Sequence, residues 1–533
     1  MSPDCLPFSA LPHSPPLFTD FTANFARVRA FYPHPPQVSE IMQRRPELNY
    51  DPDRRARVSA VLERQNRAWG ASELTLENIA RLRRGGEAMV TGQQVALFGG
   101  PLYSIYKALS AIKFAQQLTQ AGRECVPVFW LATEDHDFAE VSQATLFSAN
   151  KGLIQLELET TIGPNRPVSE IRLGQAIAAL LQPAQEALGK NEITDLLQSC
   201  YAPRETMGSA FARLFTRLFS KFGLIVLDPS DPELHRIAAP LYQASIKKSE
   251  SLVQALLDRG SKIEAAGYEP QVKITNSSTL LFRLQNEERL PIRRANGGFI
   301  AGNEKLSEQQ LAEEITAHPE RFSPNVLLRP VTQDFLLPTV AYVGGPSEVA
   351  YFAQANVVYQ QLLGRATPIL PRFSATLIDP KSRRIIEQYR VTVGDALQGP
   401  EHVRERLAEQ HLPKELESTL ENTQRELEKS LSHIVAQLKK LDPTLVDAAE
   451  KSVSKVEYQL DHLKKKAAHA QLRRRQELRR HSDHLSDSIY PNRNLQEREI
   501  AAISFLAQHG PALLDRIYEA IQANCLGHQL VQI

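Results

Sequence analysis

The sequence predicts an α/β protein with a parallel-sheet core, two inserted subdomains and an α-helical coiled coil towards the C-terminus. A short strand at Glu87–Val90 leads into a helix at Pro101–Gln120, and an almost unbroken apolar strand follows at Cys125–Ala132. Strand, helix and strand in this order form the βαβ unit of parallel sheets. A seven-residue apolar repeat after residue 400 indicates the coiled coil.

The composition is that of an ordinary globular protein. The 533 residues are 42% hydrophobic and 23% charged, with a formal net charge of +1, so nothing favours nucleic acid or acidic membranes as partners. No run reaches the roughly 18 apolar residues of a membrane span, and no signal peptide opens the chain. We therefore expect a cytoplasmic protein that contacts neither membrane nor nucleic acid.

The four cysteines are far apart and form no CxxC pair. They are Cys5, Cys125, Cys200 and Cys525. This spacing matches neither a disulfide framework nor a zinc ribbon, and a reducing compartment fits it best. We expect no disulfide framework.

The predicted domains follow from changes in the sequence pattern. Residues 1–85 form a proline-punctuated arm and helices packed on the core, and residues 86–398 form the core itself. Alternating residues from Gly152 to Leu173 predict a strand and hairpin, followed by a helical stretch to Lys221, which places one insertion near 148–220. Short strands separated by turn residues predict a small meander as a second insertion near 261–322.

The core strands resume between and after these insertions. Gly223–Asp228 is a short buried strand followed by a proline-led helix from Pro232, and Asn325–Pro346 contains the next strand. Ala366–Leu370 closes the predicted sheet. One α/β core with two insertions accounts for these segments.

Residues 399–486 read as two long helices of a coiled coil, and residues 487–533 as a helical return to the core. Apolar residues keep a 3,4 spacing from Val446 to Ala470, and Asp442 followed by Pro443 marks the break between the helices. The basic stretch from Lys464 to Arg480 would suit nucleic acid. We favour a solvated coiled-coil face, because the segment as a whole has nearly balanced charge.

Two loops combine a strand end, a Gly-Gly-Pro sequence and a helix start. They are VTGQQVALFGGPLYSIYK at 90–107 and TVAYVGGPSEVAY at 339–351. Glycines allow close approach of a ligand, and free N–H groups at a helix N-terminus attract a phosphate or carboxylate. Two such loops at one sheet edge favour a ligand site over the alternative that each Gly-Gly-Pro sequence only begins a helix. Neither loop matches GxGxxG or GxxxxGKS/T, which disfavours a Rossmann dehydrogenase and a P-loop ATPase.

The sequence TEDHD follows the apolar strand directly. Its carboxylates and histidine, Glu134, Asp135, His136 and Asp137, would be unfavourable together unless they met a cation, a polar substrate or hydrogen-bond donors. They are candidates for amine recognition, general base catalysis or a metal. A helix cap would explain Asp137 alone, so we favour a functional role for the group.

Two further polar clusters accompany these loops. LLRPVTQD, at 327–334, offers Arg329, Gln333 and Asp334 just before the second Gly-Gly-Pro loop. YPNRNLQER, at 490–498, follows the coiled coil and suits either a ligand contact or a helix cap with surface charge.

Four stretches together resemble the bacillithiol-biosynthesis cysteine-adding enzyme family (BshC). They are VTGQQVALFGGPLYSIYK, PVFWLATEDHDFAEV, NVLLRPVTQDFLLPTVAYVGGPSEVAYFAQ and YPNRNLQER, with a coiled coil before the last. The resemblance covers nearly the whole chain. It implies a Rossmann-like core with two connecting-peptide insertions, a coiled coil that makes a homodimer, and the joining of L-cysteine to glucosaminyl-malate in the last step of bacillithiol biosynthesis.

The implied reaction forms an amide between the cysteine carboxylate and the sugar amine, which is uphill in water unless the carboxylate is activated. ATP or ADP is therefore expected. By analogy with the cysteine ligase of mycothiol synthesis, which resembles class I aminoacyl-tRNA synthetases, the intermediate would be a cysteinyl adenylate. The chain has no clear HIGH or KMSKS signature and no obvious zinc ligands for the thiol, and we predict no metal.

The resemblance also implies three groups of site residues. Glu134, Asp135, His136 and Asp137 would lie near the reacting amine as catalytic residues. The substrate-binding candidates are Gln93, Gln94, Gly99, Gly100, Tyr103, Lys107, Arg329, Gln333, Asp334, Tyr342, Gly344 and Glu348, of which Lys107 either supports an anion or only covers the surface. The nucleotide-binding candidates are Asn492, Arg493, Gln496 and Arg498.

Two alternative functions belong to other classes. One is an adenylate-forming or nucleotidyl-transferring enzyme that acts on another small acid or amine. The other is a non-catalytic, nucleotide-binding coiled-coil scaffold, for which the TEDHD residues would be dispensable.

Overall fold

The computed structural model describes residues 5–43, 48, 50–148, 152–160, 165–295, 297–409, 412–474 and 476–533. The chain forms two compact units. The first contains residues 1–376, 497–531 and 533, and the second contains residues 377–496 and 532. The second unit is thus inserted, in the sequence, between two parts of the first.

The core of the first unit is a parallel sheet, as the apolar strand patterns predict. Its order is β13–β12–β2–β3–β6, and every pairing is parallel. The strands are β2 (Glu87–Gln93), β3 (Cys125–Leu131), β6 (Ile225–Leu227), β12 (Thr339–Gly344) and β13 (Ile369–Pro371). All seven residues of β3 are buried, which explains its continuous apolar sequence.

The strand order reverses direction between β2 and β12. From β2 the chain crosses through α5 (Leu102–Gln120) to β3 on one side, and from β12 it crosses through α14 (Pro346–Leu363) to β13 on the other. Such crossovers are right-handed, so the two helices cover opposite faces of the sheet. Open α/β sheets bind ligands beyond the carboxyl ends of their strands at such a reversal.

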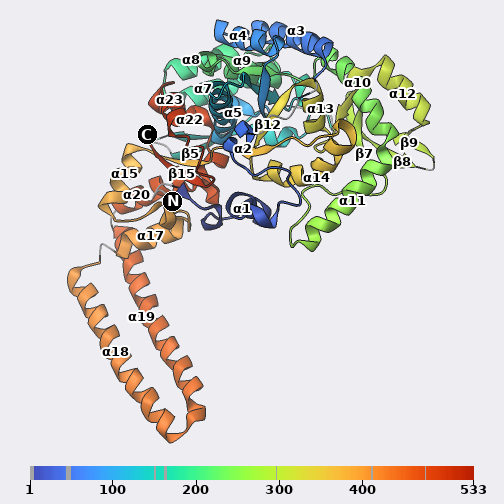
Figure 1. The fold of residues 1–533 in the computed structure, drawn as a ribbon. Coiled ribbons are helices and arrows are strands. Elements are labelled where there is room, and N and C mark those ends of the chain that lie inside the picture. The colour runs from blue at the N-terminus through green and yellow to red at the C-terminus, as the bar shows by residue number, and fades with distance from the viewer. Residues whose placement is uncertain are drawn as a thin grey trace. The chain divides into compact units, whose positions relative to one another are not determined.

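Helices from the N-terminal arm complete the first unit. The arm contains β1 (Cys5–Leu6), α1 (Pro16–Ala23) and α2 (Val38–Gln43), and then α3 (Pro52–Trp69) and α4 (Glu73–Arg83) run together along one side of the sheet (Figure 1). Asp51 caps α3 and Ser72 caps α4 through side-chain oxygens. Towards the C-terminus, α21 (Gln496–Glu499), α22 (Ala502–His509), α23 (Leu513–Ala520) and β15 (His528–Gln532) follow.

The first insertion contains a β-hairpin and helices. The hairpin pairs β4 (Gln143–Ser148) with β5 (Gly152–Glu157). It therefore begins at Gln143, earlier than the start at Gly152 that the sequence pattern predicts. After α6 (Phe138–Val141), which precedes the hairpin, the helices are α7 (Ala176–Leu188), α8 (Glu192–Cys200) and α9 (Met207–Leu218).

The second insertion is an antiparallel five-stranded sheet with helices around it, larger than the predicted meander. Its strand order is β10–β9–β8–β7–β11. The strands are β7 (Ser278–Gln285), β8 (Glu288–Ala295), β9 (Gly298–Ala301), β10 (Glu304–Leu306) and β11 (Phe322–Pro324). The helices are α10 (Pro232–Lys247) and α11 (Ser249–Ala265) before the sheet, α12 (Glu308–Ala317) within it, and α13 (Arg329–Leu336) after it.

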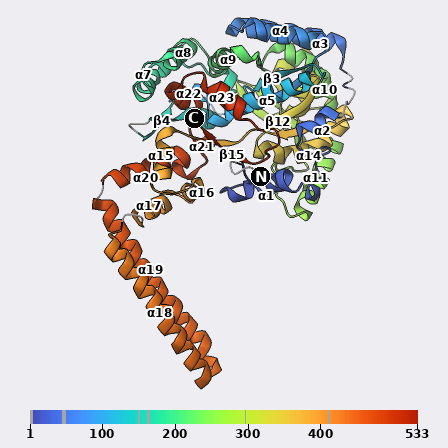
Figure 2. The same cartoon turned by 60° about the vertical axis from the view of Figure 1, so that its left-hand side comes forward.

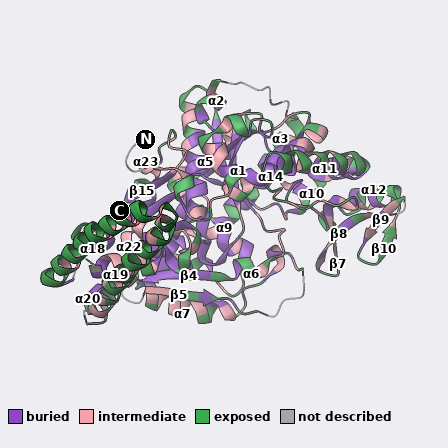
Figure 3. Ribbon diagram, turned by 90° about the horizontal axis from the view of Figure 1, so that it is seen from below, coloured by how far each residue is buried: buried purple, intermediate pink, exposed green. Residues whose placement is uncertain are grey.

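The second unit contains the predicted coiled coil. Helices α18 (Lys414–Leu441) and α19 (Val446–Arg474) lie side by side as a long hairpin (Figure 2). Asp442 accepts a hydrogen bond from the Thr444 N–H at 2.8 Å, which confirms the predicted cap before Pro443. The hairpin is mostly exposed, in contrast to the buried strands of the core (Figure 3).

Several shorter elements complete the second unit. They are β14 (Ala375–Ile378), which begins in the first unit, and α15 (Pro380–Gln388), α16 (Val393–Ala396), α17 (Pro400–Glu409) and α20 (Gln476–Ile489). Of the basic stretch on the coiled coil, Arg475 lies outside the described residues. None of the helices in the described part of the chain is both long and apolar enough to cross a membrane.

The structure contains one disulfide, although the cysteine spacing predicts no disulfide framework. Cys5 and Cys525 are joined by a disulfide, with Cα atoms 6.3 Å apart, whereas Cys125 and Cys200 are free and buried. The partners are 520 residues apart, so no local spacing indicates them. They meet because β1 pairs antiparallel with β15.

Candidate functional site

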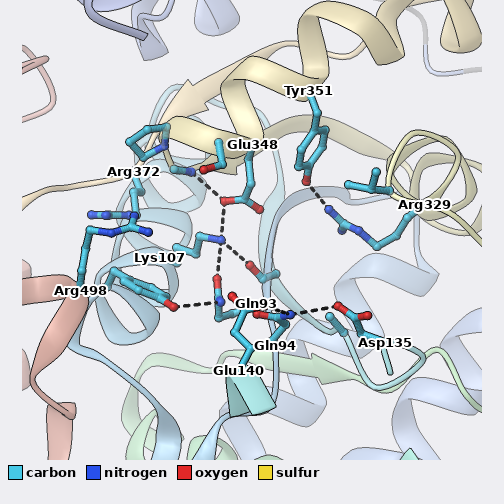
Figure 4. Close-up of a pocket in the computed structure, with 17 residues that line it drawn as sticks. Gln93, Gln94, Lys107, Asp135, Glu140, Arg329, Glu348, Tyr351, Arg372 and Arg498 are labelled. Carbon is cyan, nitrogen blue, oxygen red and sulfur yellow. Dashed lines mark hydrogen bonds and ion pairs between the residues drawn. The ribbon is translucent and has the colours of Figure 1, made fainter. Parts of the chain in front are cut away.

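A cavity of about 270 Å³ opens at the carboxyl ends of β2, β3 and β12, where the strand order reverses. Figure 4 shows its polar side chains converging from both Gly-Gly-Pro loops and from the segment after β3. The lining residues are Gly92, Gln93, Gln94, Tyr103, Lys107, Ala132, Asp135, Glu140, Val326, Arg329, Gly345, Pro346, Ser347, Glu348, Tyr351, Arg372 and Arg498. Nearly all of them carry or flank a polar group, which suits a small polar ligand.

Lys107 connects the two Gly-Gly-Pro loops. Its ammonium donates to the Gly92 carbonyl at 2.7 Å and to Oε1 of Gln93 at 2.8 Å, and it forms an ion pair with Glu348. Burial lowers the pKa of Lys107 to about 8, against the opposing effect of Glu348, so the ammonium stays protonated at neutral pH. With these partners Lys107 positions the site rather than serving as a free cation.

Glu348 is held from several directions at the start of α14. It accepts hydrogen bonds from the Gly345 N–H at 2.7 Å and from the Tyr342 hydroxyl at 2.5 Å. Burial alone would raise the pKa of Glu348, but Lys107 and these donors hold it below its usual range. Tyr342 therefore supports the site from behind, since it is fully buried and does not line the cavity.

Gln94, Asp135 and Glu140 form the acidic side of the cavity. The Gln94 amide donates to Oδ2 of Asp135 at 3.0 Å and to Oε2 of Glu140 at 2.8 Å. The Asp135 carboxylate also accepts from the His136 N–H through Oδ1. No Lys or Arg forms an ion pair with Asp135 or Glu140 among the residues that the structure describes, so both can receive a cationic or N–H group of a ligand.

Three arginines supply positive charge to the cavity wall. Arg372 is buried and forms a bidentate ion pair with Glu497, at 2.7 Å from Nη2 to Oε1 and 3.0 Å from Nη1 to Oε2. Arg329 donates to the Tyr351 hydroxyl, and Arg498 lies 5.9 Å from the centre of the Tyr103 ring. Within the described chain neither Arg329 nor Arg498 is paired with a carboxylate, which leaves two guanidinium groups available to an anion.

The four TEDHD residues point in different directions. Asp135 alone lines the cavity, while Asp137 caps α6 by accepting from the Glu140 N–H at 3.2 Å. His136 Nδ1 lies 3.1 Å from Nη1 of Arg289, which comes from β8 of the second insertion. Because these side chains diverge, they do not form the cluster that the sequence predicts.

Glu134 faces a buried histidine instead of the cavity. Its Oε1 lies 3.4 Å from Nε2 of His235 on α10. Burial raises the pKa of Glu134 to about 7 and lowers the pKa of His235 to about 4. In the described part of the chain, no group of three or more His, Cys, Asp or Glu side chains is arranged to hold a metal ion.

The first Gly-Gly-Pro sequence does not present its N–H groups to the cavity. Phe98 has a positive φ of 54° and turns the chain inward. The Gly99 N–H then donates to the Tyr201 hydroxyl at 3.1 Å, and the Gly100 N–H donates to the Leu97 carbonyl at 3.1 Å. The second sequence behaves differently, since Gly345 and Pro346 line the cavity while Gly344 ends β12.

Two other substrate-binding candidates lie in the protein interior. The Asp334 carboxylate accepts a hydrogen bond from Thr367 and lies 3.6 Å from Nη1 of Arg365. Gln333 is fully buried and lines no part of this cavity.

The nucleotide-binding candidates divide between the two units. Gln496 in the second unit is buried, and its side-chain amide bonds to the backbone of Leu377 and Ser488. Arg493 pairs with Glu401 at 2.9 Å, and Asn492 occupies a left-handed turn position with φ 49°. Arg498 belongs to the first unit and lines the cavity.

Sequence reasoning missed Arg372, Glu140 and Tyr351 as cavity residues. Tyr351 lies inside the second Gly-Gly-Pro stretch, three residues after Glu348 in α14, and this helical spacing would have placed both on one face. Arg372 directly follows β13, so its position after a core strand was the available signal. Nothing in the local sequence marks Glu140.

Comparison with known proteins identifies the family. A model described as "Bacillithiol biosynthesis BshC, N-terminal Rossmann-like domain" matches residues 1–373, and one described as "Bacillithiol biosynthesis BshC, C-terminal coiled-coil domain" matches residues 375–533. The chain belongs to the BshC family. A BshC relative from Koribacter versatilis is 44% identical over 533 residues, which is 100% of both chains.

Two further BshC relatives match over similar lengths. The Solibacter usitatus protein is 36% identical and covers 99% of both chains. The Salinibacter ruber protein is 32% identical and covers 99% of this chain and 98% of the relative. All three relatives bear the name "Putative cysteine ligase BshC". The Rossmann-like core and the coiled coil of BshC proteins are thus both present here.

Proposed function

We propose that this protein joins L-cysteine to glucosaminyl-malate, the last step of bacillithiol biosynthesis. The supporting observation is the charge arrangement of the cavity, which is lined by the Asp135 carboxylate and by two arginines, Arg329 and Arg498, that have no carboxylate partner in the described part of the chain. Glucosaminyl-malate has matching groups, namely two malate carboxylates, sugar hydroxyls and an amine. The names of the full-length relatives support the same activity.

Each part of this substrate has a counterpart in the cavity. The arginines and the N-terminus of α14 suit the malate carboxylates, because guanidinium groups and helix N-termini both attract anions. The side chains of Gln93 and Gln94 suit the sugar hydroxyls. Asp135 suits the sugar amine, which it would orient and from which it would accept a proton as the amide forms.

The size of the cavity limits what it holds at one time. Its volume of about 270 Å³ is at the lower end for ligand pockets, which favours one small substrate. The ion pair between Lys107 and Glu348 joins α5 to α14 and so fixes the distance between the two Gly-Gly-Pro loops around that substrate.

We also propose that ATP or ADP is required, because amide formation from a free carboxylate is uphill. When bound, the nucleotide supplies a group that turns a carboxylate oxygen into a leaving group. Arg498 fits an anion such as a phosphate, since no carboxylate of the described chain neutralises it. Gln496 does not fit this role, because its amide is already bonded to backbone groups.

The test uses the purified full-length chain with L-cysteine and glucosaminyl-malate, and follows product formation by mass spectrometry. Separate reactions contain Mg-ATP, Mg-ADP or no nucleotide. We expect product only with a nucleotide. Product without any nucleotide would overturn the nucleotide requirement alone, whereas no product in any reaction, with bacillithiol unchanged in a strain that lacks the gene, would overturn the cysteine-adding function.

Binding measurements separate the malate part from the nucleotide part. We expect calorimetry with glucosaminyl-malate to show binding that glucosamine does not reproduce, since glucosamine lacks both carboxylates. If Arg498 contacts a phosphate instead, Arg498→Ala will weaken nucleotide binding and leave glucosaminyl-malate binding unchanged.

We further propose that the protein is a homodimer through the coiled-coil hairpin and acts in the cytoplasm, where ATP is available. The hairpin leaves several large apolar side chains exposed, Leu441 by 79% and Tyr458 by 63%. Leu416, Ile434, Leu445, Val456 and Leu463 are exposed as well. Analytical ultracentrifugation is expected to show a dimer for the wild type and a monomer for Ile434→Asp with Leu463→Asp, and cell fractionation tests the compartment.

A further inference from the structure

The Cys5–Cys525 disulfide borders a second cavity, away from the substrate cavity. This cavity has a volume of about 340 Å³, and both cysteines belong to its wall. The wall also includes Phe8, Thr22 and Ala23 from the N-terminal arm. Both cysteine residues are partly exposed, unlike the buried Cys125 and Cys200.

The cavity suits a small, polar, uncharged or weakly charged molecule. None of its described wall residues is charged. The side chains of Gln522, Asn524 and Thr22 offer hydrogen-bonding groups to the remainder of such a molecule. Accessible disulfides exchange with thiols, whereas buried ones resist reduction.

We propose that the Cys5–Cys525 disulfide is a site of thiol–disulfide exchange with a low-molecular-weight thiol that enters this cavity. The proposal rests on the disulfide, its exposure and the cavity beside it, and it does not depend on the cysteine-adding activity. The product of that activity would itself be a thiol of this class.

The exchange balances without any further reactant. The thiolate of the small molecule attacks the sulfur of one cysteine, the bond between Cys5 and Cys525 breaks, and a mixed disulfide forms. The other cysteine leaves as a thiolate and takes a proton from water. A second small thiol attacks the mixed disulfide, which frees the second protein thiol and releases the small molecule as its own disulfide, so the small thiols supply both electrons.

Opening the disulfide would weaken the attachment of the segment before β15. Strand β1 has only two residues, which pair at Cys5 with Gln529 and at Leu6 with His528. The backbone of Gly527 lies so close to the backbone of Leu6 that a Cβ atom at Gly527 would overlap the Leu6 carbonyl. Such a short pairing is marginal without the covalent bond.

Strand β15, which follows this segment, is connected to the substrate cavity by buried hydrogen bonds. His528 Nδ1 lies 2.8 Å from Oγ of Ser374, and that hydroxyl donates to Oε1 of Glu497 at 2.9 Å. Glu497 in turn holds Arg372, which lines the substrate cavity. The exchange site is therefore linked, through residues of the first unit, to one wall of the candidate active site.

The experiment incubates the oxidised full-length protein with L-cysteine, stops the reaction with acid, alkylates free thiols and identifies disulfides by peptide mass spectrometry. Protein isolated in the reduced form is treated with cystine, because the same exchange runs in reverse. We expect a mixed disulfide with cysteine at Cys5 or Cys525 and none at Cys125 or Cys200. Hydrogen exchange is expected to rise in residues 526–531 when the disulfide opens.

Filling the cavity tests whether the small thiol enters there. Ala23→Trp, at the exposed end of α1, is expected to slow the exchange by about tenfold because the indole would occupy the space beside the sulfurs. Ala266→Trp, at the exposed C-terminal end of α11, is the matched control and should exchange at the wild-type rate. Equal rates in all three proteins, or modification only after denaturation, would overturn the proposal. Neither result bears on whether the protein adds cysteine to glucosaminyl-malate.

Discussion

Lys107 on α5 and Glu348 on α14 form a buried ion pair that joins the two halves of the core sheet at the point where the strand order reverses. Their side chains are only 5% and 14% exposed. Lys107 also donates a hydrogen bond to the Gly92 carbonyl in β2, and Glu348 accepts one from the N–H of Gly345, directly after β12. The pair therefore determines the spacing of the two loops around the candidate substrate.

Removing one partner of this pair should destabilise the protein strongly. Lys107→Met leaves the Glu348 carboxylate buried without its cation, for which the expected loss is about 3–5 kcal/mol in the free energy of unfolding. The double variant Lys107→Met with Glu348→Gln should lose less than the sum of the single variants, because it leaves no buried charge. Urea unfolding of all four proteins measures this coupling, and strictly additive losses would show that the pair contributes little.

Arg498 should contribute to binding and little to folding. Its side chain has no carboxylate partner in the described chain, so Arg498→Ala should raise KM for the anionic substrate about tenfold or more, in line with about 1.5–3 kcal/mol for a hydrogen bond to a charged group. The Tm should stay near that of the wild type. Arg516→Ala, a surface arginine on α23, serves as the control for the loss of a positive charge.

Arg372 should behave in the opposite way, although it lines the same cavity. Arg372→Ala leaves the buried Glu497 carboxylate without its bidentate partner, so we expect a loss of about 3–5 kcal/mol in stability. Thermal unfolding of the Arg372→Ala and Arg498→Ala proteins side by side measures the difference. Similar Tm values for the two variants would contradict the assigned roles.

Asp135 is the TEDHD residue expected to matter for chemistry. Asp135→Asn keeps the shape of the side chain but removes the carboxylate that would accept the proton of the amine, so kcat should fall by about 100-fold or more. Unfolding in urea should change little. Asp195→Asn in the first turn of α8 is the matched control, because it makes the same change at a residue that does not line the cavity.

The stability of the protein should depend on pH through Glu134 and His235 in opposite directions. The folded pKa of Glu134 is raised from 4.5 to about 7, so its protonated form stabilises the fold below pH 4.5 and this contribution is lost as pH rises towards 7. The folded pKa of His235 is lowered from 6.5 to about 4, so the neutral imidazole gives a contribution that is present above pH 6.5 and is lost as pH falls towards 4.

These two slopes cancel in part between pH 4.5 and 6.5 in the wild type. Glu134→Gln removes the first slope, so the stability of this variant should rise more steeply with pH over that range than that of the wild type. Urea titrations at several pH values measure the difference. If the two proteins show parallel pH profiles, Glu134 does not bind a proton more tightly in the folded state.

The sequence predicts the core of the fold well because its signals are local. A fully buried parallel strand must be continuously apolar, as in β3, and a helix break needs a cap, as at Asp442. The strand ends then locate the site, since the ends of parallel strands meet at one edge. This reasoning correctly placed the residues around Gln94 and Glu348 near one another.

Side-chain directions and distant partners were beyond such reasoning. The positive φ of Phe98 turns the first Gly-Gly-Pro sequence inward, and only the folded structure supplies the Tyr201 hydroxyl that receives the Gly99 N–H. Arg372 depends on Glu497, which is 125 residues away. The disulfide between residues 520 apart is the extreme case, since its formation follows from the pairing of β1 with β15.

The disulfide also makes the chain from residue 5 to residue 525 a covalent ring, and the coiled-coil hairpin is a loop of that ring. The turn at Pro443–Leu445 is exposed between the two long helices, so a protease can cut there without reaching the core. The two fragments would remain one molecule on a non-reducing gel and separate only after a reductant is added. A single nick thus reports, in the intact fold, whether Cys5 and Cys525 are bonded.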